Sequence, residues 1–341
     1  GYARGAFGTS VAWAGDVNAD GFGDLVVGEP DNEAFPTYGG AAHVYLGSAT
    51  GLPAAPTTTL HDPPADSGAK FGTAVAGAGD VDGDGFDDIA VGAPQQGIGT
   101  VHGFVYVYAG GAAGIAATPT TTVENPWHYV SSSFGASLAS AGDLDGDGDT
   151  ELLIGAPQAP DAERTPGVAF VYAGTPAGLS TTGTTLATPD GTLAGSGLAS
   201  CDLNGDGNLD PLVGAAWTPG RSYEGAVFVY YGDGRNLPTT HSVLLRATVP
   251  EWGANFGASV ACGDANGDGF DDLLVGAPGE ETISYQEGAA YFFLGSSTGP
   301  VITSTLWMPN PDGTYGGNFG TTVAAFGDAD GDGLAAFAVG G

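Results

Sequence analysis

The chain has 341 residues, and its 39 acidic side chains outnumber six Lys and Arg, which gives a formal net charge of −33. The basic residues are spread along the chain, which excludes a protein that binds nucleic-acid phosphates through clustered Lys and Arg. Only 13% of the residues are charged and 42% are hydrophobic, so a folded chain with a buried core is favoured over a disordered one. No apolar run of about 18 residues predicts a membrane span, and we expect that any export signal has already been removed.

One sequence pattern returns six times along the chain. It begins with a short run such as FGTSVAWAGD, continues through an acidic loop and ends in a second run such as DLVVGEP. The copies span residues 7–30, 71–94, 134–157, 196–216, 256–278 and 319–341. They recur about every sixty residues, a period that indicates a repeat architecture. Each copy predicts two strands joined by the acidic loop.

A third predicted strand follows in each of the first five units. These runs are bounded by Gly, are rich in β-branched and aromatic residues, and are too short for a helix. They lie at residues 40–48, 103–111, 167–175, 225–233 and 288–296. Thr-rich stretches such as 56–60, 118–123 and 301–307 come next and predict a more exposed fourth strand.

Four strands per unit and no helical periodicity predict an all-β protein, a β-propeller of four-stranded antiparallel blades. An array of β-sandwiches is the alternative, but its repeats are nearer ~100 residues. We expect a single propeller domain over residues 1–341. Its repeat units span approximately 7–70, 71–133, 134–195, 196–255, 256–318 and, as a partial unit, 319–341.

The sixth unit is incomplete, because the chain stops directly after its second predicted strand. A closed ring of six blades and one of seven both remain open. We expect a missing segment or a partner chain to complete this blade, since an unpaired strand edge invites further pairing.

The loop between the first two strands of each unit has the pattern D-x-[DN]-x-D-G. Counted from the first Asp, oxygen-bearing side chains recur at positions 1, 3 and 5, and five units add a carboxylate at position 9. Ca²⁺ takes six to eight oxygen ligands, and the Gly permits the sharp turn that directs alternate side chains inward. We therefore predict up to six Ca²⁺ sites, one in each loop.

The predicted side-chain ligands are Asp16, Asn18, Asp20 and Asp24; Asp80, Asp82, Asp84 and Asp88; Asp143, Asp145, Asp147 and Glu151; Asp202, Asn204, Asp206 and Asp210; Asp264, Asn266, Asp268 and Asp272; and Asp328, Asp330 and Asp332. The backbone carbonyl at position 7 is predicted as a further ligand in Phe22, Phe86, Asp149, Asn208, Phe270 and Leu334.

The sixth loop has Ala336 at position 9, so its site is predicted to bind most weakly. Asp-Gly sequences also form simple hairpin turns, but this alternative does not explain six loops with one ligand register. The predicted ligands include just over half of the 39 acidic residues. We expect the metal to be structural, neither a switch nor a catalyst.

Together, the motifs F-G-x-[ST]-V/L, D-x-[DN]-x-D-G, D-[LI]-x-V-G-A-P and G-x-V-Y-V-Y resemble the FG-GAP repeats of the integrin α-subunit β-propeller and of related bacterial proteins. The resemblance covers essentially the whole chain. It implies a propeller with calcium in the loops between first and second strands, located outside the cell and active in adhesion or recognition. The fourth unit departs from the pattern, because Ser196 stands in place of the Phe.

Sequence that varies between units is concentrated in the loops after the second and fourth strands. Successive loops of a blade alternate between its two ends, so these loops are predicted to lie opposite the calcium loops. Exposed aromatic and basic residues there suit a sugar or a protein partner, although such rings also fill gaps between blades. The candidate partner-binding residues are Trp127, Tyr129, Arg164, Trp217, Arg221, Tyr223 and Tyr285.

We expect a calcium-stabilised binding or adhesion module, secreted or at the cell surface, that recognises a protein or glycan on a cell surface or matrix. A carbohydrate-binding lectin and a structural component of an extracellular assembly are the alternatives. Nucleic-acid binding and membrane insertion are not expected. We do not expect an enzyme, because no nucleophile motif occurs and the recurrent carboxylates are assigned to metal.

Cys201 and Cys262 fall at neighbouring places in the first strands of adjacent units. A disulfide between them needs a Cα separation of about 4.4 to 6.8 Å. Because the spacing of inner strands is not given by the sequence, a bridge and two free thiols both remain open.

Overall fold

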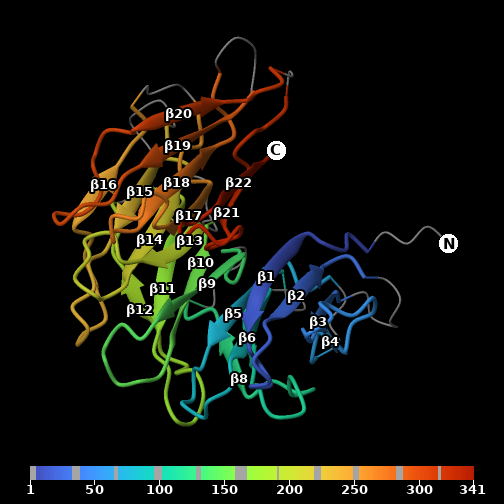
Figure 1. Cartoon of the computed structure of the whole chain (residues 1–341). Helices are drawn as coiled ribbons and strands as arrows, with labels where there is room; N and C mark the ends of the chain where they lie inside the picture. Colours follow the sequence, from blue (N-terminus) through green and yellow to red (C-terminus); the bar gives the residue numbers. More distant parts are fainter. Residues whose placement is uncertain are drawn as a thin grey trace. The chain divides into compact units, whose positions relative to one another are not determined.

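The computed structural model of the chain describes residues 5–32, 39–64, 68–95, 102–127, 132–157, 167–189, 192–218, 224–248, 253–281, 287–313 and 316–341. These residues form five four-stranded sheets and one two-stranded sheet, with no helix among them. Each sheet is called a blade here, and its strands are hydrogen-bonded in chain order (Figure 1). The prediction of an all-β fold with four-stranded antiparallel blades is thus confirmed, and the sixth blade has two strands.

The first three blades contain strands 1 to 12. Blade 1 comprises β1 (Ser10–Gly15), β2 (Asp24–Glu29), β3 (Ala41–Tyr45) and β4 (Thr58–His61). Blade 2 comprises β5 (Val75–Gly79), β6 (Asp88–Ala93), β7 (Phe104–Tyr108) and β8 (Thr121–Glu124). Blade 3 comprises β9 (Ser137–Gly142), β10 (Glu151–Ala156), β11 (Val168–Tyr172) and β12 (Thr184–Leu186).

The remaining blades contain strands 13 to 22. Blade 4 comprises β13 (Ala194–Cys201), β14 (Asp210–Ala215), β15 (Ala226–Val229) and β16 (Val243–Leu245). Blade 5 comprises β17 (Ser259–Gly263), β18 (Asp272–Ala277), β19 (Ala289–Phe293) and β20 (Leu306–Pro309). Blade 6 comprises β21 (Thr322–Ala325) and β22 (Phe337–Gly340).

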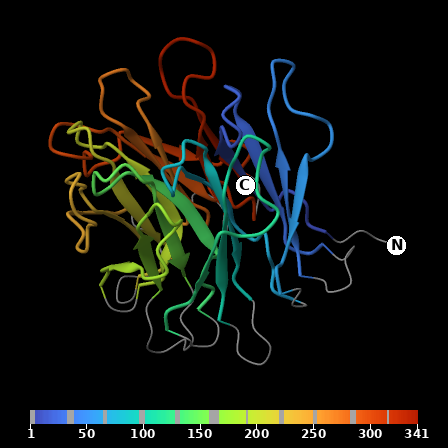
Figure 2. The same ribbon diagram turned by 90° about the horizontal axis from the view of Figure 1, so that it is seen from below.

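Two compact units divide the chain. One consists of Gly1–Glu163 with Phe170–Thr185, and the other of Arg164–Ala169 with Leu186–Gly341. In the first unit β1 packs against β5 and β5 against β9, while in the second β13 packs against β17 and β17 against β21. Within a blade, the strands run between loops at its two ends (Figure 2). That all six repeat units form one domain stays a prediction.

The recurring Phe of the first motif packs against aromatic rings on the third strand of its own blade. Phe71 is fully buried, and its ring centroid lies 5.8 Å from that of Tyr106 and 6.4 Å from that of Tyr108. Blades 3 and 5 repeat this arrangement with Phe134 and Phe256. Tilted and edge-on rings of this kind add to the stabilisation from burial. The F-G and V-Y-V-Y motifs are therefore two halves of one packing unit.

Neighbouring blades meet through small residues at the end of the second strand. A side chain on Gly92 would collide with the backbone oxygen of Gly135 in the next blade. Gly135 in turn has φ of +82° and donates its N–H to the Gly155 carbonyl at 2.9 Å. Only glycine combines this close approach with a positive φ.

The described fourth strands are the more exposed ones, as predicted. β20 has exposed Leu306 and Trp307, and β8 alternates between buried and exposed residues. Within the described ranges, no helix has the length and apolar character needed to cross a membrane.

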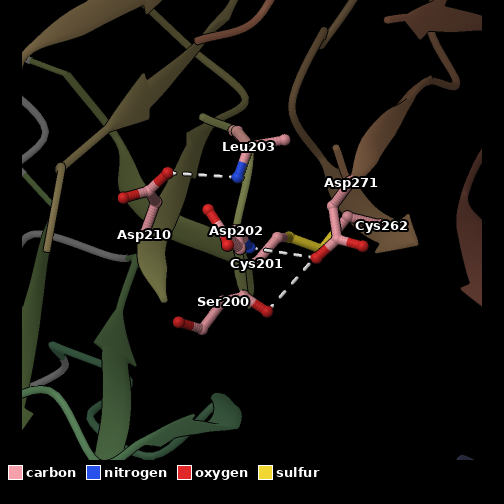
Figure 3. Close-up of a disulfide and its surroundings, with 7 residues drawn as sticks. All are labelled: Ser200, Cys201, Asp202, Leu203, Asp210, Cys262 and Asp271. Carbon is pink, nitrogen blue, oxygen red and sulfur yellow. Dashed lines mark hydrogen bonds between the residues drawn. A yellow bond between two sulfur atoms is a disulfide. The ribbon is translucent and has the colours of Figure 1, made fainter. Parts of the chain in front are cut away.

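A disulfide joins Cys201 at the end of β13 to Cys262 in β17, with the two Cα atoms 6.3 Å apart (Figure 3). The adjacent blades therefore bring their first strands within the range that a disulfide requires. This settles the alternative that the sequence left open. The bridge links blades 4 and 5 directly beside their acidic loops.

Replacing both cysteines by serine is expected to lower the free energy of unfolding by about 2 to 4 kcal/mol, because the bridge closes a loop of 61 residues. Guanidinium-induced unfolding in calcium buffer measures the change. Wild-type protein in reductant is the matched control and should unfold at the same denaturant concentration as the double variant. A double variant as stable as the oxidised wild-type protein would contradict this expectation.

Candidate metal sites

Each acidic loop is organised by the carboxylate of its first Asp. In loop 1, Asp16 Oδ1 accepts the N–H of Asp20 at 3.0 Å, and Oδ2 accepts that of Gly21 at 2.8 Å. The same bond to the position-6 Gly occurs in all six loops. The position-5 carboxylate accepts the N–H of position 7 in every loop, at 2.9 to 3.0 Å. These bonds wrap the backbone around the acidic side chains.

The carboxylate at position 9 is fully buried in the first five blades and is the first residue of the second strand. The residues are Asp24, Asp88, Glu151, Asp210 and Asp272. One oxygen accepts the N–H of position 2 in its own loop, at 2.6 to 3.2 Å. The other accepts the N–H of the Gly that follows the third strand, at 2.7 to 3.1 Å. The acidic loop and the turn after the third strand thus lie at the same end of the blade, as predicted.

Burial raises the pKa of these carboxyl groups above the ordinary range. The pKa rises to about 7 for Asp88, Glu151 and Asp210, because desolvation outweighs the two hydrogen bonds from backbone N–H groups. The pKa values of Asp24 and Asp272 shift in the same direction for the same reason. A nearby positive charge would therefore be needed to keep these carboxyl groups fully ionised at neutral pH.

Oxygen atoms from different loop positions converge in three of the loops. One carboxylate oxygen from each member of the set lies within 4.8 Å of the others for Asp80, Asp82 and Asp88; for Asp143, Asp145 and Glu151; and for Asp328, Asp330 and Asp332. In loops 1, 4 and 5, position 3 is an Asn instead: Asn18, Asn204 and Asn266. The amide oxygen is also a ligand that calcium accepts.

The position-3 carboxylates give a direct test of whether the loops fit a cation. Oδ1 of Asp82 and Oδ1 of Asp145 are buried and accept no hydrogen bond. Burial and the neighbouring acids raise the pKa of both groups. A buried oxygen without a partner is costly, and a hard divalent cation would satisfy it. Neither ion pair found among the described residues, His43 with Glu29 and Lys70 with Asp31, involves a loop carboxylate.

The sixth loop lacks this buried part. Asp328, Asp330 and Asp332 are exposed, and Ala336 occupies position 9. Its first Asp still accepts the N–H groups of Gly331 and Gly333. The turn of this loop is therefore the same, but the set of oxygens is smaller.

Sequence reasoning missed three acids at the loops. Asp87 and Asp271, at position 8, accept the N–H of the first Asp of the preceding blade. The backbone carbonyl of Asp149 stays a predicted ligand in its own loop, and its buried side chain in addition lies beside Gly83 in the loop of blade 2. Burial and the nearby Asp147 and Asp80 raise its pKa. In each case, the sequence feature that could have indicated the contact is an additional Asp at position 7 or 8, beside the side-chain ligand positions 1, 3, 5 and 9.

Two of the candidate partner-binding residues are described. Trp127 is 37% exposed, and its ring packs edge-on against Phe170, with the centroids 5.3 Å apart. The Trp217 carbonyl accepts the N–H of Leu193 at 2.9 Å. The other candidates, Tyr129, Arg164, Arg221, Tyr223 and Tyr285, lie outside the described residues.

Fold and loops together define a repeat protein of the β-propeller class, in which each blade presents an acidic loop between its first two strands. Four segments match the FG-GAP repeat family: residues 7–45, 71–108, 134–178 and 256–293. These four segments are FG-GAP repeats, and over them the chain is similar to integrin alpha subunits, as its motifs predicted. Blades 4 and 6 lie outside these matches; blade 4 has Ser196 in place of the motif Phe, and blade 6 has Ala336 in place of the position-9 carboxylate.

The relatives that the chain matches are integrin alpha subunits. Integrin alpha-3 from Cricetulus griseus is 39% identical over 153 residues, which is 44% of this chain and 14% of the relative. Integrin alpha-PS5 from Drosophila melanogaster is 35% identical over 158 residues, 45% of this chain and 15% of the relative. Integrin alpha-7 from Homo sapiens is 40% identical over 150 residues, 44% of this chain and 12% of the relative. The match thus spans a small part of each relative's length.

Calcium binding to the loops is expected to weaken as the pH falls. In the metal-free protein, a native pKa of about 7 means that protonation of Asp88, Glu151 and Asp210 favours folding below pH 7, and this contribution is lost as the pH rises through 7. Calcium requires the ionised form, so its stabilising effect should be larger at pH 8 than at pH 5.5. Calorimetric unfolding of metal-stripped and calcium-loaded protein at both pH values measures it. Equal calcium-induced shifts at the two pH values would contradict the assignment.

The substitution Ala336→Asp is expected to tighten the weakest site. It restores the position-9 carboxylate to a loop that already has three convergent carboxylates. Equilibrium dialysis with radioactive calcium should show one site of raised affinity and no change in the others. Ala336→Asn, which adds an amide of the same shape, is the control for charge. Six equal calcium affinities in the wild-type protein would contradict the prediction that the sixth loop binds most weakly.

Proposed function

We propose that the acidic loops bind Ca²⁺ and that the bound ions stabilise the blades of an extracellular binding module. The observation that carries this proposal is the buried Oδ1 of Asp82 and of Asp145, which accept no hydrogen bond while two further carboxylates converge on each. The residues predicted from the sequence at positions 1, 3, 5, 7 and 9 are proposed as the ligands. Up to six ions would bind, and the sixth loop would bind most weakly.

We propose a structural role for the metal rather than a catalytic one. The loops join two strands of one blade, and the position-9 carboxylate also holds the turn after the third strand through the N–H of Gly110 in blade 2. An ion at this point would connect three strands. Extracellular calcium modules bind at about 10⁻⁴ to 10⁻³ M, so tenfold excess calcium would stabilise each site by about 1.4 kcal/mol.

We propose adhesion or ligand binding as the activity, by analogy with the integrin alpha subunits that the chain resembles. The loops at the end opposite the acidic loops are the proposed binding surface, and a cell-surface or matrix protein is the proposed partner. Trp127 at this end keeps 37% of its surface exposed, which suits contact with a partner. The protein would act outside the cell, where calcium is abundant.

The partner is tested by applying the full chain to arrays of matrix proteins and of glycans, each with calcium and with chelator. Calcium-dependent binding to a matrix or surface protein supports the proposal. Calcium-dependent binding to a defined sugar instead would make the protein a lectin. Absence of binding to either array by folded, calcium-loaded protein would contradict a recognition role and favour a structural one. The exposed Trp127→Ala variant, with Trp307→Ala on β20 as matched control, then tests the surface.

Removal of calcium is expected to lower the midpoint of thermal unfolding by about 10 °C or more, because several sites contribute together. Circular dichroism in about 10 mM calcium and after removal of metal measures the difference. Magnesium at the same concentration should give a much smaller shift, since it demands a tighter octahedral shell. An unchanged midpoint would contradict structural calcium sites.

A further inference from the structure

The first Asp of an acidic loop is held from the neighbouring blade as well as from its own. In the first compact unit, the N–H of Asp16 donates to Oδ2 of Asp87 at 2.7 Å. In the second, the N–H of Asp202 donates to Oδ2 of Asp271 at 2.9 Å (Figure 3). Both acceptors lie at position 8 of the following blade's loop. A carboxylate that accepts a backbone N–H makes a strong, directional bond.

A second bond runs along the backbone at the same place. The N–H of position 8 donates to the carbonyl of the preceding blade's first Asp, from Asp271 to Asp202 at 3.0 Å and from Asp87 to Asp16 at 3.5 Å. In Asp87 and Asp271, backbone and side chain together therefore enclose the first Asp of the neighbouring loop. The side chain of Asp87 also fills the space beside Gly15, where a Cβ would collide with it.

Position 8 directly precedes the buried carboxylate at position 9. Asp87 is thus covalently joined to Asp88, which belongs to the site of its own blade, while its side chain holds Asp16 in the site of the blade before. Any rearrangement of Asp88 on metal binding has to act on Asp87. One dipeptide serves two neighbouring sites.

We propose that Asp87 and Asp271 are positioning residues that couple the metal site of one blade to that of the next, in the pairs of blades 1–2 and 4–5. Each side chain fixes the backbone of the first ligand residue, so that its two oxygens face the loop before the ion arrives. Preorganisation of this kind raises affinity because less ordering is left to occur on binding. The inference rests on the calcium sites proposed above.

The chain contains its own comparison. In the pairs of blades 2–3 and 5–6, position 8 is Thr150 or Ala335, and only the backbone bond is present, to Asp80 and to Asp264, each at 2.8 Å. Among the described loops, a position-8 side chain therefore accepts the N–H of the neighbouring first Asp in two pairs, while the contact of Asp149 with loop 2 comes from position 7. In blade 4, the Cys201–Cys262 disulfide adds a covalent link one residue before Asp202.

Terbium, which binds calcium sites and is excited through nearby tryptophan, can read the first site alone. The indole of Trp13 lies against Gly23 in loop 1. The terbium luminescence of the full chain that disappears in the Trp13→Phe variant is therefore the signal of this site. Titration with terbium gives its half-saturation concentration.

Asp87→Ala is expected to raise that concentration about tenfold, since a charged hydrogen bond to the ligand backbone is lost. Asp87→Asn keeps an oxygen acceptor and should stay within about threefold of the wild-type protein. An unchanged Asp87→Ala variant would overturn the positioning role. Equal weakening by Ala and Asn would also overturn it, because charge alone would then explain the effect. Far-UV circular dichroism checks that both variants fold, and the Asn variant keeps the test decisive if the Ala variant does not.

Coupling is tested by a double-mutant cycle. Asp84→Ala, at an exposed position of loop 2, should weaken the first site when Asp87 is present and have a smaller effect in the Asp87→Ala background. Equal effects in both backgrounds would refute coupling. The matched control uses loop 2, where position 8 of the next blade is Thr150. A Phe86→Trp substitution in the Trp13→Phe background makes the terbium signal report on loop 2. Thr150→Ala should leave the half-saturation concentration of this site unchanged.

The terbium titration distinguishes a missing metal site in blade 1 from missing coupling between blades 1 and 2. If the wild-type chain gives no terbium signal that depends on Trp13, the metal site of blade 1 is wrong and the coupling falls with it. If the wild-type chain titrates and Asp87→Ala titrates identically, the calcium site stands and only the coupling is wrong.

Discussion

A carboxylate that is taken out of water must be offset by hydrogen bonds and by positive charge, and blades 1 to 5 each bury one where the second strand begins. The local geometry follows from this requirement. Both oxygens receive a backbone N–H, one from the acidic loop and one from the Gly after the third strand, so the loop and the turn have to meet at one end of the blade. The two hydrogen bonds do not neutralise the buried negative charge. A cation that did so would have to lie in the loop, where the other acids converge.

The apolar side chains are buried between the sheets. In the first compact unit, the core between blades 1 and 2 combines small residues such as Ala14 and Ala42 with the rings of Phe71, Tyr106 and Tyr108. In the second, Phe256 and Tyr291 take part in an equivalent core with Leu212 and Val227. These two cores therefore combine small side chains with aromatic rings from the blades that meet there. An array of such blades can place its acids at one end without disturbing the core.

The sequence predicted the strands and loops well because the period of the repeat carries both signals at once. A run such as DIAVGA predicts a buried strand from its composition and also starts with the ligand Asp88, so an error in one assignment would have disturbed the other. The departure of the fourth unit did not mislead, because β13 to β16 form the same sheet without the motif Phe.

Other features depend on distances between blades, which a sequence does not contain. The Cys201–Cys262 pairing depends on the Cα separation of 6.3 Å, which results from the packing of β13 against β17. The positions of Asp87, Asp271 and Asp149 were missed for the same reason, since their contacts are with the preceding blade. The ligand pattern describes one loop at a time, and the structure shows that neighbouring loops share residues.

The central claim is that the buried carboxylates of the first five blades share a calcium ion with the acids of their loop. Anomalous diffraction from crystals grown in calcium, collected at a long wavelength, tests this most directly because it locates each ion without reference to stability. The account predicts a peak in each of loops 1 to 5, in contact with the position-9 carboxylate and the first Asp, and a weaker peak or none in loop 6. Calcium-saturated crystals with no peak beside Asp88 and Glu151 would contradict it.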